Sequence, residues 1–554
     1  MTAEAWIIDG YVDEPACLGV PPYISPYIRT VAGVLSHHDY AVRYCTIDQI
    51  RSDLSFLTSA GKSDLVVMIA GVTVPGKYLG GTPATYTDVR QVGASLTGPV
   101  TLLGGPILFG SSTGGGARAI RQQEYGFDHL LQGSPGQALD RFLSGNSMQV
   151  SDAYSHSYQE EDQWGLTGAR VVTQHPLFPH VLCEIETARG CPHAATGGCS
   201  FCTEPFYGNP VYRSIDGIED EIASLYRNGI RHFRLGRQPD LLSYQAGQGE
   251  FPRPRPEIIS DLFTRIRKAA PDLLTLHIDN INPGTIARHP DASREALSVI
   301  VEGHTPGDVA AFGMETADPA VIEANNLKGD PDMMLEAIRI VNEVGSVREK
   351  GIPHLLPGLN FISGLAGETP DTYRLNSEFL NRVMKEGLLI RRVNIRQLMP
   401  FEGTRAWEDN RLPVDDHQFR RFKEEVRKTF DLPMLRKVFP TGTILRQVIV
   451  EESGDMSFGR QLGSYPILAG IPLQVQPRSI LDLVIVDHGM RSVTALPWPI
   501  PINDIPSKVI KWIPGLNKTA QVKVLAKRPF RDISDLERAT GTSFPPGLFT
   551  FRSP

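Results

Sequence analysis

Two stretches of this chain alternate short apolar strands with helical segments, and this alternation constrains the fold more than any other feature. In residues 1–145 the strand candidates are "AWIIDGYV", "AVRYCTID", "SDLVVMIAGV" and "VTLLGGP", and "YIRTVAGVLSHHDYAV" has helical spacing of its apolar residues. Strands that alternate with helices predict a parallel, doubly wound α/β sheet. Ligands of such sheets lie beyond the carboxyl ends of the strands, where glycine turns follow two of these candidates. The glycines also fit a simpler role in tight turns.

The alternation returns in residues 181–435. Six strand candidates follow one another there, from "HVLCEIE" to "RRVNIRQLM", with helical stretches between them. About six such units predict a partial or full (β/α) barrel, whose site lies at the carboxyl ends of its strands.

The other regions lack this alternation. The stretch 143–165 is polar and without clear period, so we expect an irregular linker over 146–180. Residues 436–500 predict a small β-domain. Residues 501–554 predict two or three short helices, and the segment 505–554 holds nine Lys or Arg against three Asp or Glu.

Composition narrows the class of protein. The 554-residue chain has 41% hydrophobic residues and a formal net charge of −7, which gives no reason to expect a polyanion binder as a whole. Its N-terminus lacks the pattern of a signal peptide, and no apolar run approaches the roughly 18 residues of a membrane span. Six cysteines, half of them clustered, do not make a disulfide framework. We expect a soluble, cytoplasmic protein without a membrane partner.

Three cysteines follow the first strand of the second region with the spacing C-x7-C-x2-C: Cys191, Cys199 and Cys202. His193 would complete a Cys3His structural zinc site, which leaves no open position. Alternatively, three thiolates hold a [4Fe–4S] cluster and leave one iron open to a ligand. Three unpaired structural cysteines are the simplest alternative. The position between the first strand and helix of a barrel favours a catalytic cluster.

The loop "RGCPHAATGGCSFC" resembles the cluster loop of radical SAM enzymes, whose usual spacing is C-x3-C-x2-C. The resemblance implies that Cys191, Cys199 and Cys202 bind three irons of a [4Fe–4S] cluster. It also implies that S-adenosylmethionine (SAM) chelates the fourth iron and that Phe201 packs against its adenine.

Further stretches resemble radical SAM motifs, in the order of that family. "RLGRQPD" stands at the Gly-Gly-Glu position and makes Gly236, Arg237 and Gln238 candidate SAM contacts. "FGMETADPAVIEANNLKG" makes Glu315 a candidate SAM ligand, with a structural carboxylate as the alternative. "GLAGET" is similar to the glycine motif after the fifth strand and "MPFEGT" to the one after the sixth. Gly364 and Gly367 are SAM candidates that also fit plain turns.

The N-terminal region resembles the Rossmann-like cobalamin-binding domain that is fused to some radical SAM barrels. "LLGGP" (102–106) and "LLQGSPGQAL" (130–139) match later glycine turns of that domain. The D-x-H-x-x-G signature is absent, so the resemblance implies cobalamin without a histidine ligand, held by the backbone at Thr73, Gly104, Gly105 and Ser134.

Together, residues 1–430 resemble cobalamin-dependent (class B) radical SAM methyltransferases. The likeness extends to an archaeal group that methylates a glutamine of methyl-coenzyme M reductase, a post-translational modification linked to methanogenesis. The resemblance implies radical hydrogen abstraction from an unactivated carbon, methyl transfer from methylcobalamin, and an electron donor such as ferredoxin. Hydrogen-atom abstraction needs no acid–base pair, and we assign no catalytic side chain.

The C-terminal tail supports a rival function. It resembles a helix-hairpin-helix with the turn "IPGLN" (513–517), in which Asn517 replaces a glycine and is expected to adopt positive φ. Lys518 and Lys523 would contact nucleic-acid phosphates, or belong to a solvated basic face or a protein-docking module. The rival is a radical SAM methylthiotransferase or other nucleic-acid-modifying enzyme. A methylthiotransferase needs three N-terminal cysteines, and only Cys17 and Cys45 precede the linker. A non-catalytic zinc and nucleic-acid binding protein leaves the ordered barrel motifs unexplained.

Overall fold

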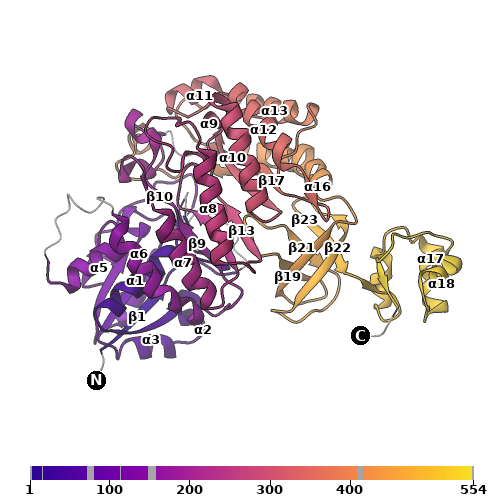
Figure 1. Cartoon of the computed structure of the whole chain (residues 1–554), viewed down its shortest axis with the longest axis horizontal. Helices are drawn as coiled ribbons and strands as arrows, with labels where there is room; N and C mark the ends of the chain where they lie inside the picture. Colours follow the sequence, from indigo (N-terminus) through magenta and orange to yellow (C-terminus); the bar gives the residue numbers. More distant parts are fainter. Residues whose placement is uncertain are drawn as a thin grey trace.

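The computed structural model describes residues 3–14, 17–71, 80–112, 114–146, 157–409 and 416–551. Figure 1 shows the N-terminal sheet domain at one end, a barrel at the centre, a small β-barrel beside it, and a helical tail that projects at the other end.

A five-stranded parallel sheet forms the N-terminal domain. In their order across the sheet the strands are β5 (Ala41–Thr46), β1 (Glu4–Asp9), β6 (Leu65–Ile69), β7 (Val100–Gly104) and β8 (His129–Leu131). Helices cover both faces: α1 (Pro26–His37) and α5 (Pro135–Leu143) on one, and α2 (Ile47–Ser52), α3 (Ser55–Ala60) and α4 (Tyr86–Ser95) on the other. The register aligns Asp9, Ile69 and Gly104, so the carboxyl ends of the strands form one edge. The predicted Rossmann-like sheet is confirmed.

The segment after β1 leaves the N-terminal sheet and connects this domain to the barrel. The chain forms β2 (Asp13–Glu14) and β3 (Cys17–Leu18), and then β4 (Tyr23–Ile24) pairs in parallel with the first barrel strand. The N-terminal domain therefore contributes an edge strand to the sheet of its neighbour.

The segment between the two domains is more regular than its sequence predicts. Helix α6 spans Tyr158–Gly168, a 3-10 helix continues through Ala169–Gln174, and α6 packs along α1. The prediction of irregular structure is wrong for these residues. Only a few side chains anchor α6, chiefly Trp164 and the buried carboxylate Glu161, so no apolar stripe marks the helix in the sequence.

Six parallel strands build the central domain: β9 (Leu182–Glu186), β12 (His232–Gly236), β13 (Thr275–Ile278), β14 (Asp308–Glu315), β17 (Leu355–Ser363) and β18 (Arg392–Gln397). A single bridge between Asn280 and Ala311 connects the β9–β12–β13 sheet to the β14–β17–β18 sheet. In the described part of the chain no pairing joins the outer edges, β4 and β18. The domain is a partial (β/α) barrel that is open on this side, within the predicted fold class.

Helices surround the outside of this barrel (Figure 1). They are α7 (Ile215–Arg227), α8 (Pro256–Ala269), α9 (Pro283–Arg288), α10 (Pro290–Gly303), α11 (Pro319–Ala324), α12 (Pro331–Gly345) and α13 (Pro370–Lys385), followed by α14 (Arg405–Asp409), α15 (Asp416–Val426) and α16 (Leu432–Val438).

The predicted β-domain is a closed barrel. Its strands are β19 (Ile444–Glu452), β20 (Ser457–Arg460), β21 (Leu468–Ile471), β23 (Ser492–Pro497) and β22 (Ile480–His488), in that order around the barrel. The tail holds β24 (Ile500–Pro501), a 3-10 helix over Ser507–Trp512, α17 (Lys518–Lys527), α18 (Ile533–Thr540) and β25 (Phe549–Thr550).

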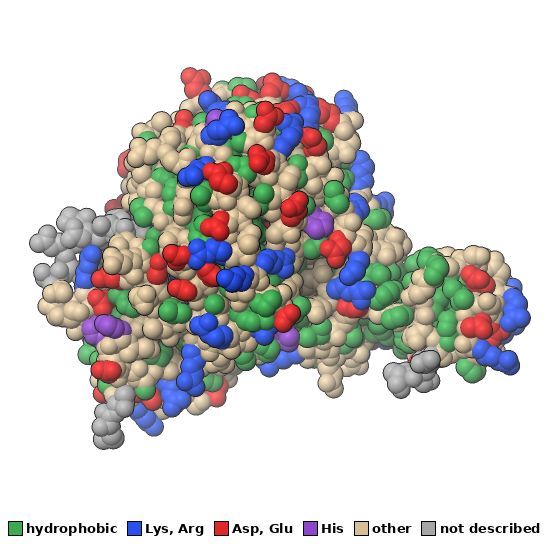
Figure 2. All heavy atoms as spheres, viewed as in Figure 1, with side chains coloured by type: hydrophobic (Ala, Val, Ile, Leu, Met, Phe, Trp, Pro, Cys, Tyr) green, Lys and Arg blue, Asp and Glu red, His purple; other side chains and the backbone are tan. Residues whose placement is uncertain are grey.

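The turn before α17 differs from its prediction. Asn517 has φ −74° and caps the helix, because its side chain accepts a hydrogen bond from the Ala520 N–H. The expectation of positive φ at Asn517 is wrong, and Gly515 (φ +82°) supplies the left-handed residue. Lys and Arg side chains lie at the far end of the tail in Figure 2.

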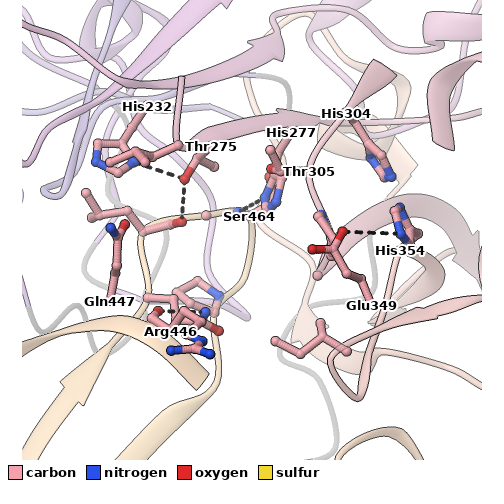
Figure 3. A pocket seen from close by; sticks show the side chains of 18 of the residues that line it. His232, Thr275, His277, His304, Thr305, Glu349, His354, Arg446, Gln447 and Ser464 are labelled. Atoms are coloured by element: carbon pink, nitrogen blue, oxygen red, sulfur yellow. Dashed lines mark hydrogen bonds and ion pairs between the residues drawn. The ribbon is translucent and has the colours of Figure 1, made fainter. Parts of the chain in front are cut away.

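The loop between β20 and β21, residues 461–467, closes the N-terminal end of the central barrel. The Ser464 N–H donates to His277 Nδ1 at 2.7 Å, and Thr275 Oγ1 donates to the Leu462 carbonyl at 3.0 Å (Figure 3). A cavity of about 650 Å³ beside this loop is lined by five histidines, including His232 and His304. Burial lowers the pKa of His232 and His304 to about 3, so both are neutral near pH 7. This cavity lies at the opposite end of the barrel from the three cysteines.

Candidate active site

The carboxyl edges of the N-terminal sheet and of the barrel face each other. The chain after β7 lies against the chain after β18, where the Ala119 N–H donates to the Pro400 carbonyl at 2.9 Å. Phe109 from the same N-terminal segment packs against Phe206 and Tyr207 of the cysteine loop, with ring centroids 5.9 and 6.2 Å apart. Any ligand between the domains is therefore reached by residues from both sheets.

The cysteine loop compensates for its long first gap by local folding. Between Cys191 and Cys199 the chain forms a 3-10 turn, Pro192–Thr196, followed by Gly197 and Gly198 with φ +90° and +69°. The extra residues are taken up in this turn, and the cysteines still converge. The pKa of the Cys202 thiol is raised, mainly by burial and then by the nearby Cys199 and Cys191.

The structure argues against the zinc alternative. His193 Nε2 lies 2.8 Å from the Asn326 carbonyl, and Nδ1 lies 2.6 Å from Glu250 Oε1. Both ring nitrogens are engaged, so the Cys3His zinc site is wrong. Across the described ranges, no three His, Cys, Asp or Glu side chains surround one metal position. Three convergent cysteines without a fourth protein ligand fit a [4Fe–4S] cluster with one open iron.

Two asparagines that we did not single out in the sequence hold this loop. Ser200 Oγ donates to Asn325 Oδ1 at 2.6 Å, and the Ser200 N–H donates to the Asn325 carbonyl at 3.0 Å. Asn326 Nδ2 donates to the carbonyls of Thr196 and Gly198 at 3.0 and 2.9 Å. Both asparagines follow α11 and belong to the same stretch that identified Glu315, which was the available signal.

Lys328 is a third site residue that the sequence reasoning missed. Burial opposes the charge of its ammonium group, but Cys191, Cys199 and Cys202 together raise its pKa above the ordinary value. The ammonium therefore lies beside all three cysteines. A fixed cation there favours the thiolate form and any anionic group bound next to the cluster.

Glu315 ends β14 with unusual geometry. Its backbone is left-handed (φ +57°), and the pairing of β14 with β17 shifts register between Gly313 and Glu315. Its Oε2 is buried without a hydrogen-bond partner. Burial raises its pKa to about 8, against the opposing effects of Arg396 and Lys328. An unsatisfied buried carboxylate oxygen fits a cationic ligand group, as the sequence prediction requires.

The three candidate SAM contacts at the end of β12 have different surroundings. Gly236 has no room for a Cβ, because Glu184 Oε1 occupies that space. Arg237 is fully buried with φ +54° and forms ion pairs with Glu14 of the N-terminal domain and Glu204 of the cysteine loop. Gln238 Oε1 is buried without a hydrogen-bond partner, a free acceptor that fits an ammonium donor. Their contacts with SAM stay predictions.

The predicted adenine side of the site is apolar. Phe201 packs on a cluster that contains Val321, Leu365 and Leu398. Gly364 and Gly367 flank Leu365 with φ +97° and +86°, conformations that favour glycine. Because Leu365 lies between them, Phe201 and both glycines form one region of the barrel mouth.

The predicted cobalamin contacts are spread along the N-terminal edge. Thr73 lies outside the described residues. Gly104 ends β7, and Gly105 has φ +99° with the Ala70 carbonyl where a Cβ would be. Ser134 Oγ donates to Glu161 Oε1 of α6, so its side chain is engaged.

Space at this edge is small. The cavity lined by Tyr27, Gly105, Gly133 and Tyr207 has about 10 Å³, room for a single water molecule. The glycine turns fit a corrinoid that approaches the backbone.

Comparison with known proteins defines the class. Residues 185–375 match the sequence profile of the Radical SAM superfamily. The fold is similar to that of a radical S-adenosylmethionine methyltransferase, TsrM, from Kitasatospora setae, solved with cobalamin and a [4Fe–4S] cluster bound. The TM-score is 0.51 at 14% identity, over 73% of this chain and 77% of that one. The chain contains a radical SAM domain, whose cofactors are a [4Fe–4S] cluster and SAM.

Sequence relatives come from archaea. An uncharacterized protein of Methanocaldococcus jannaschii is 43% identical over 89% of this chain and 93% of its own length. An uncharacterized protein of Archaeoglobus fulgidus is 40% identical over 97% and 98%. At this similarity the chain belongs to the same family as these two proteins. None of the helices in the described ranges is both long and apolar enough to cross a membrane.

Proposed function

We propose that this protein is a cobalamin-dependent radical SAM C-methyltransferase. One observation carries the proposal: the carboxyl edge of a Rossmann-like sheet faces the mouth of a radical SAM barrel that holds three convergent cysteines. Such an interface brings one cofactor from each sheet within reach of one substrate.

The residues of the site divide into separate roles. Cys191, Cys199 and Cys202 would hold the cluster, and Glu315 and Gln238 offer free acceptors to the SAM ammonium group. The backbone at the end of β7 would approach cobalamin. The cluster with SAM supplies radical chemistry when bound, and cobalamin supplies a transferable methyl group. The facing domains exclude water from the space between them.

For the substrate, we propose the glutamine of methyl-coenzyme M reductase that the archaeal methyltransferases modify, with a ferredoxin-type electron donor in the cytoplasm. The archaeal origin of the relatives supports this choice. A synthetic peptide that contains this glutamine tests it: the expected product is heavier by one methylene group, and no product after complete reconstitution rejects this substrate.

Cofactor content tests the proposed function itself. We expect anaerobically purified protein, reconstituted with iron, sulfide and hydroxocobalamin, to contain about four irons and nearly stoichiometric cobalt. A Cys191/Cys199/Cys202→Ala triple variant should lose the iron and keep the cobalt. Cys45 is buried in β5 and lies outside the cysteine loop, so Cys45→Ala is the control and should keep both. Iron without cobalt removes the cobalamin-dependent mechanism, and zinc with neither rejects the whole proposal.

A further inference from the structure

The open side of the barrel contains a second large cavity, of about 520 Å³. Residues of the two sheet edges line it, Tyr23 of β4 on one side and Val393 of β18 on the other, and the small β-barrel closes a third side. Its most distinctive feature is charge. Five arginines line the cavity, against the two carboxylates Asp13 and Asp431: Arg391, Arg392, Arg396, Arg460 and Arg491.

Two of these arginines are already neutralised. Arg460 pairs with Glu451 at 3.0 Å, and Arg491 lies 3.8 Å from Asp431. The other three arginines form no ion pair with any carboxylate of the described ranges. They come from one segment of the chain: Arg391 immediately precedes β18, Arg392 begins it and Arg396 is its last residue but one.

The environment of two of these arginines, Arg391 and Arg392, opposes their charge. The Arg391 guanidinium donates to the Tyr465 carbonyl, but its Nε is buried without an acceptor. Burial, and then repulsion by Arg392, lowers the Arg391 pKa to about 9. Burial also lowers the Arg392 pKa to about 10; Tyr465 opposes this effect, and Arg396 and Arg491 add to it. A bound anion would relieve this repulsion, so the cavity is complementary to negative charge.

The arginines also connect the outside of the barrel to the active site. Side chains alternate along β18, which places Arg392, Asn394 and Arg396 on one face and Val393 and Ile395 on the other, buried face. The Arg396 charge lowers the Glu315 pKa, so it lies near the end of β14, where the SAM candidates are. The row of arginines leads from the cavity toward that site.

We propose that this cavity, named here the β4–β18 cleft, binds an acidic peptide segment of the substrate, whose carboxylate is held by Arg392 and Arg396. The inference rests on the proposed function and narrows its substrate class to an acidic stretch of polypeptide.

A peptide suits the cleft better than a nucleic acid does. Among the described residues, β18 is the outer strand of its sheet, and an extended chain can pair with such an edge. Apolar side chains such as Val20, Leu435 and Leu468 line the walls and suit peptide side chains. The carboxylates of Asp13 and Asp431 also line the cavity and would disfavour a run of phosphates.

A binding experiment tests the inference without turnover. The full-length reconstituted protein is titrated into two fluorescein-labelled ten-residue peptides and followed by anisotropy. Both have a central glutamine; one carries two glutamates on each side, and the other carries glutamines there. We expect the acidic peptide to bind at least about tenfold more tightly at low salt, and this preference to shrink as salt rises.

Variants locate the binding site. Arg392→Gln/Arg396→Gln should remove most of the preference for the acidic peptide. Arg374→Gln, on the exposed face of α13, is the matched control and should keep it. Unchanged iron content and melting temperature show that the double variant is folded. If it is not, each single variant is measured, and each should weaken the acidic peptide alone.

Three results would overturn the inference. They are equal affinity for both peptides, an unchanged preference in the folded arginine variants, or tighter binding of a labelled single-stranded oligonucleotide that the same substitutions abolish. Iron and cobalt are measured in the same preparations, so a failed cofactor test remains distinguishable from a failed peptide preference.

Discussion

At the scale of single residues, Glu315 is the most informative position. It combines a left-handed backbone, a buried carboxylate oxygen without a partner, and a raised pKa. A ligand cation would satisfy the buried oxygen and lower the pKa of the carboxylate. We expect Glu315→Gln to weaken SAM binding by roughly tenfold or more, because a charge-assisted hydrogen bond is lost. Anaerobic calorimetry measures the affinity. Glu323→Gln, on the exposed surface of α11, is the control, and equal affinities in both variants would exclude Glu315 as a SAM ligand.

Asp9 gives the N-terminal domain a specific pH dependence. It ends β1, accepts hydrogen bonds from the Tyr11 N–H and the Tyr44 hydroxyl, and is buried, which raises its pKa from 3.8 to about 7. The folded domain therefore binds a proton that the unfolded chain has released between about pH 4 and 7. The stability that this proton contributes is lost as pH rises toward 7.

The substitution Asp9→Asn removes this dependence. At pH 8 we expect the variant to unfold with a free energy greater by roughly 2–4 kcal/mol, since one pKa unit corresponds to about 1.4 kcal/mol. At pH 4 the difference should vanish. Urea denaturation from pH 4 to 8 measures it, with Asp39→Asn at an exposed position as the control. A constant difference across this range would contradict the assignment.

Some residues of the site could be predicted from the sequence, and others could not. The three cysteines and Glu315 stand in motifs whose residue types are tied to their chemistry. Asn326 and Lys328 stand in the same stretch as Glu315, but their roles depend on contacts across the barrel mouth that the stretch alone does not specify. Gly236 stays a predicted SAM contact, and the structure adds a packing requirement, because Glu184 Oε1 fills the space of a Cβ.

At the scale of elements, the turn after α11 determines whether the cysteine loop is rigid. Asn326→Ala removes two hydrogen bonds to the loop carbonyls, each worth about 1 kcal/mol. We expect the cluster to form but to be lost several-fold faster to an iron chelator, as followed by its visible absorbance. Asn146→Ala, at an exposed position in the N-terminal domain, should lose iron at the original rate. Equal rates would mean that the asparagine does not stabilise the loop.

Elements with strong apolar pattern were predictable, and weakly patterned ones were not. Strands such as β6 are continuous apolar runs because both of their faces are buried, whereas polar and apolar residues alternate along β18. Helix α6 is held by Trp164 and by a carboxylate that pairs across the domain interface, so its burial is invisible to periodicity. Asn517 was also mispredicted. Asparagine is favoured both as a helix N-cap and at turn positions with positive φ, so the residue type alone does not distinguish the two.

At the scale of the whole molecule, the 461–467 loop joins the β-barrel to the central barrel. Removing residues 441–554 would uncover Thr275 and His277, which the loop contacts. We expect this truncation to lower the melting temperature of the radical SAM domain by several degrees. Removing only residues 503–554 should leave that transition nearly unchanged. Calorimetry of both truncated proteins measures the two melting temperatures. Equal effects would show that the loop contributes no stability.

The arrangement of the domains was not predictable from the sequence. The fold class of each region followed from strand and helix patterns. However, the pairing of β4 with β9, the closure of the barrel by a loop, and the arginine-lined cleft all depend on contacts between segments far apart in the chain. Such contacts leave no local pattern.

The pairing of β4 with β9 also bears on how the chain folds during synthesis. Tyr23 leaves the ribosome about 160 residues before its partner Leu182, a delay of roughly 10–30 s at ordinary translation rates. Throughout that interval β4 lacks the strand with which it pairs in the folded protein. Newly made chains are therefore most vulnerable to aggregation before the first barrel strand emerges, and a chaperone that shields this short segment would act within that interval.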